Sequence, residues 1–156
     1  MSQKDPYKTY RLVSDPFYES PLVTLLIMHV LRNGKKSISQ RIVYSAIENI
    51  AMKVKEDPLE IIERAIKNVI PAVEIRSRRI GGSTYQVPTE VRVHRGISLS
   101  IRWVIKFAKI RPGKSMSLKL ANELLDASKN LGNSIRKKED THKMAEANRA
   151  FAHYRY

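Results

Sequence analysis

Hydrophobic residues recur with a helical period in six stretches of the chain. Ser37 is predicted to cap the second helix, and Asp57-Pro58 to open the third with Asp57 as its N-cap. Arg111-Pro112-Gly113 separates the fourth helix from the fifth, and Gly132 ends the fifth. The expected helices cover residues 21–31, 37 to about 50, 57–70, about 97–110, about 116–130 and about 134–151.

The apolar face of each amphipathic helix predicts which side chains enter the core. The only tryptophan, Trp103, aligns with Leu99 and Phe107 at i, i+4 spacing, so it is expected to be mostly buried. The other residues predicted to face inward include Ile38, Ile42, Val43, Ala46, Ile47 and Ile50, then Ile62, Ala65, Ile66 and Val69, then Leu118, Ala121, Leu124 and Leu125, and finally Ile135, Met144, Ala145 and Phe151.

Between the third and fourth helices the period changes from 3.6 to 2, which predicts a β-hairpin over residues 73–91. A two-residue Gly81-Gly82 turn would pair Arg76 with Val87. A three-residue loop, 81–83, would instead pair Arg79 with Tyr85 and collect the apolar residues on one face. The longer loop is therefore the predicted one.

These elements predict a mainly α fold, a six-helix domain with one protruding β-hairpin between the third and fourth helices. Residues 1–20 lack a helical period and contain Asp5-Pro6 and Asp15-Pro16, so they are expected to form an extended N-terminal arm. Residues 21–156 are expected to form a single domain, because 156 residues suit one core better than two.

Charge changes the picture from a helical domain to a domain with a polyanionic partner. The chain has 29 Lys and Arg against 15 Asp and Glu, a net charge of +14. Residues 71–115 alone carry ten basic and two acidic residues, a net of +8. These charges would also keep a hairpin edge soluble, but so many cations without local acids repel one another unless a polyanion is present. Nucleic acid is the first candidate and an anionic membrane surface the second.

Two further basic clusters lie beside expected helix starts, where backbone N–H groups attract phosphate. Gly34-Lys35-Lys36-Ser37 resembles the end of a Walker A loop, but the first glycine of that motif is absent. Cations at Arg136-Lys137-Lys138 oppose the dipole of the last helix, which an external phosphate would explain. The candidate phosphate-binding residues are Lys35, Lys36, Arg76, Arg78, Arg79, Arg92, Arg95, Arg102, Arg111, Lys114, Arg136, Lys137 and Lys138.

Several chemistries have no support in the sequence. There is no cysteine, which excludes disulfides and cysteine-based zinc sites. His142 and Glu146 have metal-ligand spacing but no third ligand, so no metal and no cofactor are expected. No catalytic constellation stands out, so the protein is not expected to be an enzyme. No apolar run approaches the length of a membrane span.

Long segments resemble the small-subunit ribosomal protein seven family, of the bacterial and plastid type. The similarity covers roughly residues 13–156, whereas residues 1–12 depart from the usual basic start. The segments that carry it are 76–88 (RSRRIGGSTYQVP) and 136–155 (RKKEDTHKMAEANRAFAHYR), with Asp15-Pro16, 34–37, Ile101-Arg102-Trp103 and 120–124 in matching order.

The resemblance implies a structural constituent of the small ribosomal subunit. Its polyanion would be the 3′ major domain of small-subunit rRNA, bound early to nucleate head assembly. The hairpin would lie by the mRNA exit and the exit-site tRNA, and the last helix would face that tRNA and ribosomal protein eleven, among other head proteins. The residues expected to face tRNA and mRNA are Gly81, Gly82, Ser83, Thr84, Tyr85, Lys143, Arg149 and Arg155.

Two other classes of function remain as alternatives, a DNA-binding or nucleoid protein and an RNA-modifying enzyme. The N-terminal residues show no targeting segment, which fits a bacterial or an organelle-encoded gene. The break at 111–113 and the isoleucine-rich core are similar to plastid members. The plastid (chloroplast) stroma is therefore the favoured location, ahead of the bacterial cytoplasm or the mitochondrion.

Overall fold

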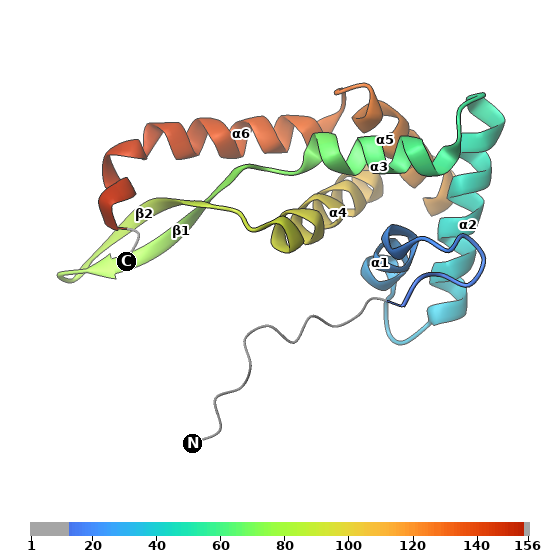
Figure 1. Ribbon diagram of the computed structural model, residues 1–156, viewed down its shortest axis with the longest axis horizontal. Helices are drawn as coiled ribbons and strands as arrows, with labels where there is room; N and C mark the ends of the chain where they lie inside the picture. The colour runs from blue at the N-terminus through green and yellow to red at the C-terminus, as the bar shows by residue number, and fades with distance from the viewer. Residues whose placement is uncertain (1–12, 155–156) are drawn as a thin grey trace, which may run out of the picture.

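The six predicted helices and the hairpin are all present in the computed structural model, which describes residues 13–154 (Figure 1). The hairpin lies between the third and fourth helices, so the predicted fold class is confirmed. A short 3₁₀ helix, η1, follows the last α-helix. The elements are α1 Pro21–Val30, α2 Lys36–Lys53, α3 Pro58–Val69, β1 Val73–Ile80, β2 Ser83–Glu90, α4 Val93–Ile110, α5 Met116–Ser128, α6 Asn133–Ala147 and η1 Arg149–Tyr154.

One apolar core joins α1 to α5, and α6 reaches it only through Ile135. α5 packs against α2, α3 and α4, which makes it the central helix. Neither strand contributes to this core, and the hairpin extends away from it beside α6 (Figure 1). Each large side chain buried here contributes about 1.5–3 kcal/mol to folding. The largest are Leu26, Ile50, Ile62, Ile101, Leu120 and Leu124.

One predicted helix cap is confirmed and the other is wrong. Asp57 caps α3, because its side chain accepts a hydrogen bond from the Leu59 N–H at 3.0 Å. Ser37 does not cap α2, whose N-cap is Lys35. The preceding turn explains the shift. Gly34 has a φ of 72° and the Lys35 N–H bonds to the Arg32 carbonyl, so the chain enters the helix before it reaches the serine.

α4 begins one turn earlier than predicted, at Val93 rather than Ile97. Gly96 made the first turn look unfavourable, since glycine lowers helix propensity by about 1 kcal/mol. Here the glycine is buried, and a Cβ at this position would lie only 2.9 Å from Cγ2 of Ile70. Tertiary packing therefore overrides propensity, because only glycine lets α4 approach the end of α3 this closely.

Three residues predicted to face inward are exposed, namely Ile38, Leu118 and Met144. Ile38 and Leu118 each lie in the first turn of their helix. The buried face of α5 is centred on Leu120 and Leu124, which places Leu118 beside it rather than on it. Met144 is on α6, which covers the hairpin more than the core, so its side chain lines a surface cleft instead.

The predicted hairpin register is wrong, and the two-residue turn is the one that forms. Ile80 pairs with Ser83, Arg76 with Val87, and Tyr85 with Arg78 rather than Arg79. Gly81 and Gly82 have φ values of 57° and 87°, the left-handed pair required by a type I′ turn, whose twist matches the strands. The alternation was a poor guide because β2 packs against both α6 and η1, which buries the neighbours Val87 and Pro88.

Within the expected N-terminal arm, residues 15–20 form a turn that packs on α2. The buried Asp15 carboxylate accepts hydrogen bonds from the Tyr18 N–H and from the Tyr44 hydroxyl of α2, at 3.1 and 2.9 Å. The rings of Phe17, Tyr18 and Tyr44 pack together. The rest of the expected arm, residues 1–12, lies outside the described residues. Over residues 13–154, no helix is both long and apolar enough to cross a membrane.

Candidate nucleic-acid interface

Four exposed cations line one face of α4. Arg95, Arg102, Lys106 and Lys109 follow one another at spacings of seven, four and three residues, which keeps them on one side of a helix. The opposite face of α4 enters the core through residues such as Ile101, so the cations point outward. We call this row the α4 cationic face.

The α4 cationic face continues onto the turn between α1 and α2. Lys109 lies in a groove with Arg32 and Lys35, two residues of that turn. Burial and the charge of Arg32 lower the pKa of Lys109 below its ordinary value. Cations that repel one another in this way are stabilised when an anion binds between them. The predicted phosphate ligand Lys36 is the next residue, exposed at the first position of α2.

At its other end, the α4 cationic face meets the base of the hairpin. The Glu74 carboxylate of β1 accepts hydrogen bonds from Nε of Arg76 at 2.7 Å and from Nε of Arg95 at 2.8 Å. Glu74 is 8% exposed, whereas both arginine side chains are about half exposed. Burial raises the pKa of Glu74, but the bonds from Arg95 and Arg76 outweigh it, and the net pKa is lowered.

Two helices begin at this basic surface without a side-chain cap. The first turns of α2 and α4 contain no acidic residue, and no side-chain hydrogen bond caps either helix. In α6, by contrast, the Ser134 N–H of the first turn donates to the Glu123 carboxylate at 3.2 Å. Lys36 and Arg92 lie at the starts of α2 and α4 and are exposed, as is Arg136 on α6. Free N–H groups, the positive end of the helix dipole and a nearby cation together suit a phosphate.

Besides Arg76 and Arg95, two further predicted phosphate ligands have partners inside the protein. Nε of Arg111 donates to the fully buried Glu123 at 2.5 Å, and its Nη2 donates to Asp126. Burial by itself would lower the pKa of Arg111. The hydrogen bonds to Asp126 and Glu123 raise this pKa by more than burial lowers it, so the net pKa is raised. Nζ of Lys138 donates to the Asn68 carbonyl at 2.7 Å. These bonds join α4, α5, α6 and α3, which gives both cations a structural role.

Three other predicted ligands lie on the hairpin or just before the start of α5. Arg79 and Lys114 are exposed, and Arg78 is partly buried. The tip glycines, Gly81 and Gly82, have open space around them, and a Cβ at either would meet no atom within 4 Å. Ser83, Thr84, Lys143 and Arg149 are exposed too, whereas Arg155 lies outside the described residues.

Tyr85 is not a free aromatic at the hairpin tip. Its ring packs against Phe151 and Tyr154 of η1, with centroid separations of 5.3 and 5.5 Å. This contact ties the C-terminal 3₁₀ helix to β2 rather than to the helical core. The hairpin and the tail therefore form one unit beside α6 (Figure 1).

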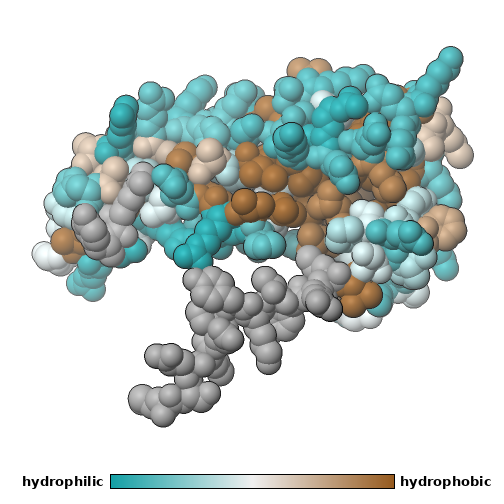
Figure 2. All heavy atoms as spheres, viewed as in Figure 1, coloured by the Kyte–Doolittle hydropathy of each residue, from teal (hydrophilic) through white to brown (hydrophobic). Residues whose placement is uncertain are grey.

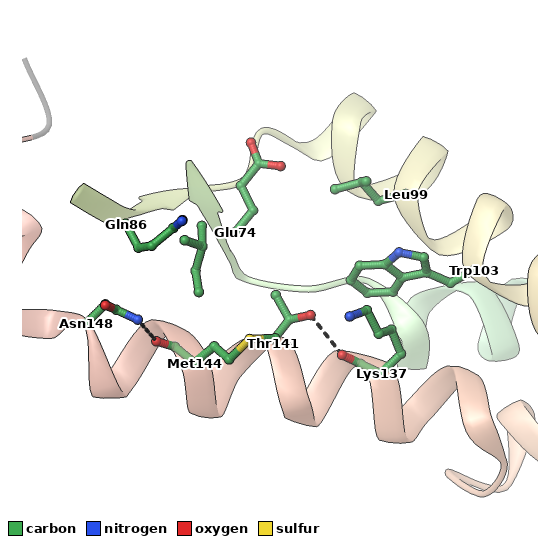
Figure 3. A pocket seen from close by; sticks show the side chains of 9 residues that line it. Glu74, Gln86, Leu99, Trp103, Lys137, Thr141, Met144 and Asn148 are labelled. Carbon is green, nitrogen blue, oxygen red and sulfur yellow. Dashed lines mark hydrogen bonds between the residues drawn. The ribbon is translucent and has the colours of Figure 1, made fainter. Parts of the chain in front are cut away.

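A cleft of about 530 Å³ lies between the hairpin, α4 and α6, and Figure 3 shows its lining side chains. Trp103 and Leu99 form its α4 wall, and Lys137 and Met144 come from α6. Trp103 packs against the core with less than half of its surface exposed, as predicted, and its ring also lines this cleft. Figure 2 shows the same region as an apolar band between α6 and α4, bordered by hydrophilic side chains.

Sequence reasoning missed three members of the basic surface, Arg32, Lys106 and Lys109. Lys106 and Lys109 show an i, i+4, i+7 spacing from Arg102, which is a signal available in the sequence. The approach of Lys109 to Arg32 has no local signal, because it depends on how α1 packs beside α4.

The described residues contain no group of three or more His, Asp or Glu side chains that would hold a metal ion. His142, one half of the spacing noted in the sequence, accepts a hydrogen bond from the Ala72 N–H at 3.1 Å through Nε2. Its ring therefore joins α6 to the segment before β1.

Comparisons with known proteins identify the family of the chain. A family model described as Ribosomal protein S7p/S5e matches residues 2–149. A curated relative from Thermosynechococcus vestitus is 55% identical over 156 residues, and one from Thermobifida fusca is 54% identical over 156 residues, each covering all of both chains. A relative from Acaryochloris marina is 55% identical over 142 residues, 91% of each chain. All three are named small ribosomal subunit protein uS7.

The family model spans nearly the whole chain, and the identities are high over full length. The resemblance expected from the hairpin and the last helix is thereby confirmed. The chain belongs to the ribosomal protein S7p/S5e family, a family of structural proteins rather than enzymes.

Proposed function

We propose that this protein is a constituent of the small ribosomal subunit that binds the 3′ major domain of the rRNA and nucleates assembly of the head. The observation that carries the proposal is the continuous basic surface from Arg76 and Arg95, along Arg102 and Lys106, to Lys109. Within residues 13–154, Arg102, Lys106 and Lys109 form no ion pair with an acidic side chain, so a folded RNA with closely spaced phosphates complements them. The names of the relatives support the small subunit as the site of action.

The exposed candidates divide into two groups by position. The α4 cationic face, the starts of α2 and α4, and Lys114 contact rRNA in this proposal, together with Arg136 on α6. The hairpin tip, Lys143 and Arg149 face the mRNA exit and the exit-site tRNA, and the tail of α6 faces ribosomal protein eleven. The open space around Gly81 and Gly82 supports close approach of a backbone at the tip. Arg111 and Lys138 are left out of the proposed interface because each is partly buried and bonds inside the protein, whereas Arg76 and Arg95 remain half exposed beside Glu74.

The first experiment measures affinity for a transcript of the 3′ major domain as a function of salt. Each phosphate neutralised by the protein releases counterions, so log K should fall linearly with log salt. Replacing both Arg102 and Lys106 with alanine should weaken binding and make that slope shallower by about two. Lys67→Ala, an exposed change on α3, is the matched control and should alter neither.

The same binding assay separates the alternatives. Duplex DNA competing as well as the transcript would favour a nucleoid protein, and equal binding to an unrelated rRNA domain of similar length would leave only a general polyanion binder. A slope near zero between low and physiological salt would contradict the electrostatic proposal itself.

The proposed location is the ribosome of the plastid stroma, in preference to a bacterial cytoplasm or a mitochondrion. The cyanobacterial relatives support a plastid lineage, although the relative from Thermobifida fusca is equally similar. Fractionation of the source organism, with detection of the protein in plastid ribosomes, tests this part of the proposal.

A further inference from the structure

The base of the hairpin contains a carboxylate, that of Glu74, at the point where two arginines of the proposed RNA surface meet. Oε1 of Glu74 accepts from Nε of Arg76 at 2.7 Å and from Nε of Arg95 at 2.8 Å. Oε2 accepts from Arg95 as well, at 2.8 Å. One carboxylate therefore gathers two guanidinium groups that come from different elements, β1 and α4.

The burial of the three side chains is unequal. The side chain of Glu74 is 10% exposed, and that of each arginine is 51% exposed. The carboxylate is thus covered, while the guanidinium groups that cover it reach solvent. Arg95 donates to Glu74 through Nε, whereas Arg76 contacts the same carboxylate through both Nε and Nη2. Two guanidinium groups that bond the same carboxylate lie close enough to repel each other. Without the carboxylate, both side chains would spread into solvent.

We propose that Glu74 is a positioning residue for RNA binding, which holds Arg76 and Arg95 together as a single clamp for a backbone phosphate. The planar guanidinium presents parallel N–H donors, so an arginine fixed at one edge can bond a phosphate with its other edge. Side-chain order that already exists in the free protein is not lost again on binding. The inference rests on the proposed rRNA-binding function.

The clamp and the net charge predict opposite changes in RNA affinity when Glu74 is replaced. Removing an acidic residue from a basic surface should strengthen binding to RNA if only charge matters. If Glu74 acts by positioning, Glu74→Gln should weaken binding, on the order of tenfold, the effect of losing one charge-assisted arrangement. The low pKa of the carboxylate means that it is ionised at neutral pH, so the variant does remove a charge.

The test uses the full chain and a transcript of the 3′ major domain, with fluorescence anisotropy as the measure of affinity. Glu139→Gln is the matched control, because Glu139 is exposed on α6 and its loss also raises the net charge by one. The control should bind as well as the parent or slightly better, while Glu74→Gln binds more weakly. Circular dichroism and thermal melting of each variant show that the fold is retained.

A double-mutant cycle identifies the route of the effect. In a background of Arg76→Gln and Arg95→Gln, the change Glu74→Gln should have no further effect on affinity, since it acts only through those arginines. If Glu74→Gln does not fold, Arg95→Lys makes the same test. It keeps the charge but loses the planar fork, so it should weaken binding without changing the salt slope.

The outcomes separate this inference from the function on which it rests. Binding by Glu74→Gln that equals or exceeds that of the parent overturns the clamp and leaves rRNA binding intact, as does an unchanged affinity for Arg95→Lys. Failure of the parent protein to bind the transcript overturns the proposed function instead.

Discussion

At the scale of single residues, the ion pair of Arg111 and Glu123 places a fully buried carboxylate among several hydrogen-bond donors. Glu123 is fully buried, and its Oε1 also accepts from the backbone N–H of Ser134 at 3.2 Å. Gly132 lies against this network with a φ of 94°, so a side chain there would be strained. Arg111, in the loop that ends α4, thus also joins α4 to α5, and Glu123 joins α5 to α6.

Replacing Arg111 with methionine should destabilise the protein by about 3–5 kcal/mol, because it leaves the Glu123 carboxylate buried without its partner. Urea unfolding followed by circular dichroism measures this loss. Lys114→Met, an exposed change in the same loop, is the control and should shift stability by less than about 0.5 kcal/mol. Equal stability of the two variants would show that Arg111 is free for RNA.

His142 gives the second residue-scale prediction. Burial and the charge of Lys138 lower the pKa of His142 below its ordinary 6.5, and its Nε2 must be unprotonated to accept from Ala72. A histidine with a depressed folded-state pKa binds fewer protons when folded. Its stabilising contribution is therefore complete above pH 6.5 and declines as the pH falls toward the lowered value.

The urea midpoint of the parent should drop more between pH 7.5 and pH 5.5 than that of His142→Gln, because the glutamine side chain that replaces the imidazole does not titrate. His94→Gln, an exposed change at the start of α4, should keep the pH dependence of the parent. An identical drop in all three proteins would rule out His142 as a source of the pH dependence.

At the scale of elements, the hairpin and η1 depend on each other. Tyr85 contacts both Phe151 and Tyr154, and β2 packs along η1. The C-terminal segment is thus anchored to the hairpin. It would have been anchored to the helical core if Phe151 had packed there, as the sequence predicted. Truncation after Ala147 removes one side of this contact, so it changes the hairpin as well as the tail.

Phe151→Ala should speed amide hydrogen exchange in β2 by roughly 3- to 10-fold, which corresponds to about 0.5–1.5 kcal/mol for an aromatic pair. Exchange in α2 and α5 should not change, because their amides lie in the separate core. Tyr85→Ala should give the same pattern, and the two changes together should add little. Faster exchange throughout the protein would instead place Phe151 in the core.

At the scale of the whole molecule, folding stability and the proposed binding surfaces are largely separate. The apolar core lies among the helices, with no contribution from either strand. The hairpin and the tail extend from that core along α6 (Figure 1). Such an arrangement lets the outer parts take the shape of an RNA surface without cost to the core.

Replacing residues 78–85 with a short turn should leave the α-helical content unchanged and the melting temperature within a few degrees of the parent value. The physical reason is that the deletion removes no residue of the main core. Far-ultraviolet circular dichroism and calorimetry measure both quantities. Binding to the 3′ major domain should persist in part, since the α4 cationic face remains, and loss of the folded core on deletion would contradict this division.

Local sequence signals determined the number and order of the α-helices and strands, but not the short helix η1. Helical period, breakers such as Pro112-Gly113 and the cap at Asp57 act between residues a few positions apart, so they can be recognised in the sequence. The excess of cations over residues 71–115 indicated a polyanionic partner for the same reason. The resemblance in the hairpin and the last helix led to the family.

Tertiary packing decided the rest. The hairpin register follows from turn twist and from cover on two sides by α6 and η1, neither of which alternation within the strands reveals. Whether a basic residue faces solvent or an internal carboxylate depends on segments distant in the chain, as the contrast between Arg102 and Arg111 shows. The sequence alone determined the sign and amount of the charge, which indicates a polyanionic partner. Only the fold decided which cations are free to meet it, because electrostatic energy depends on distance in space rather than distance along the chain.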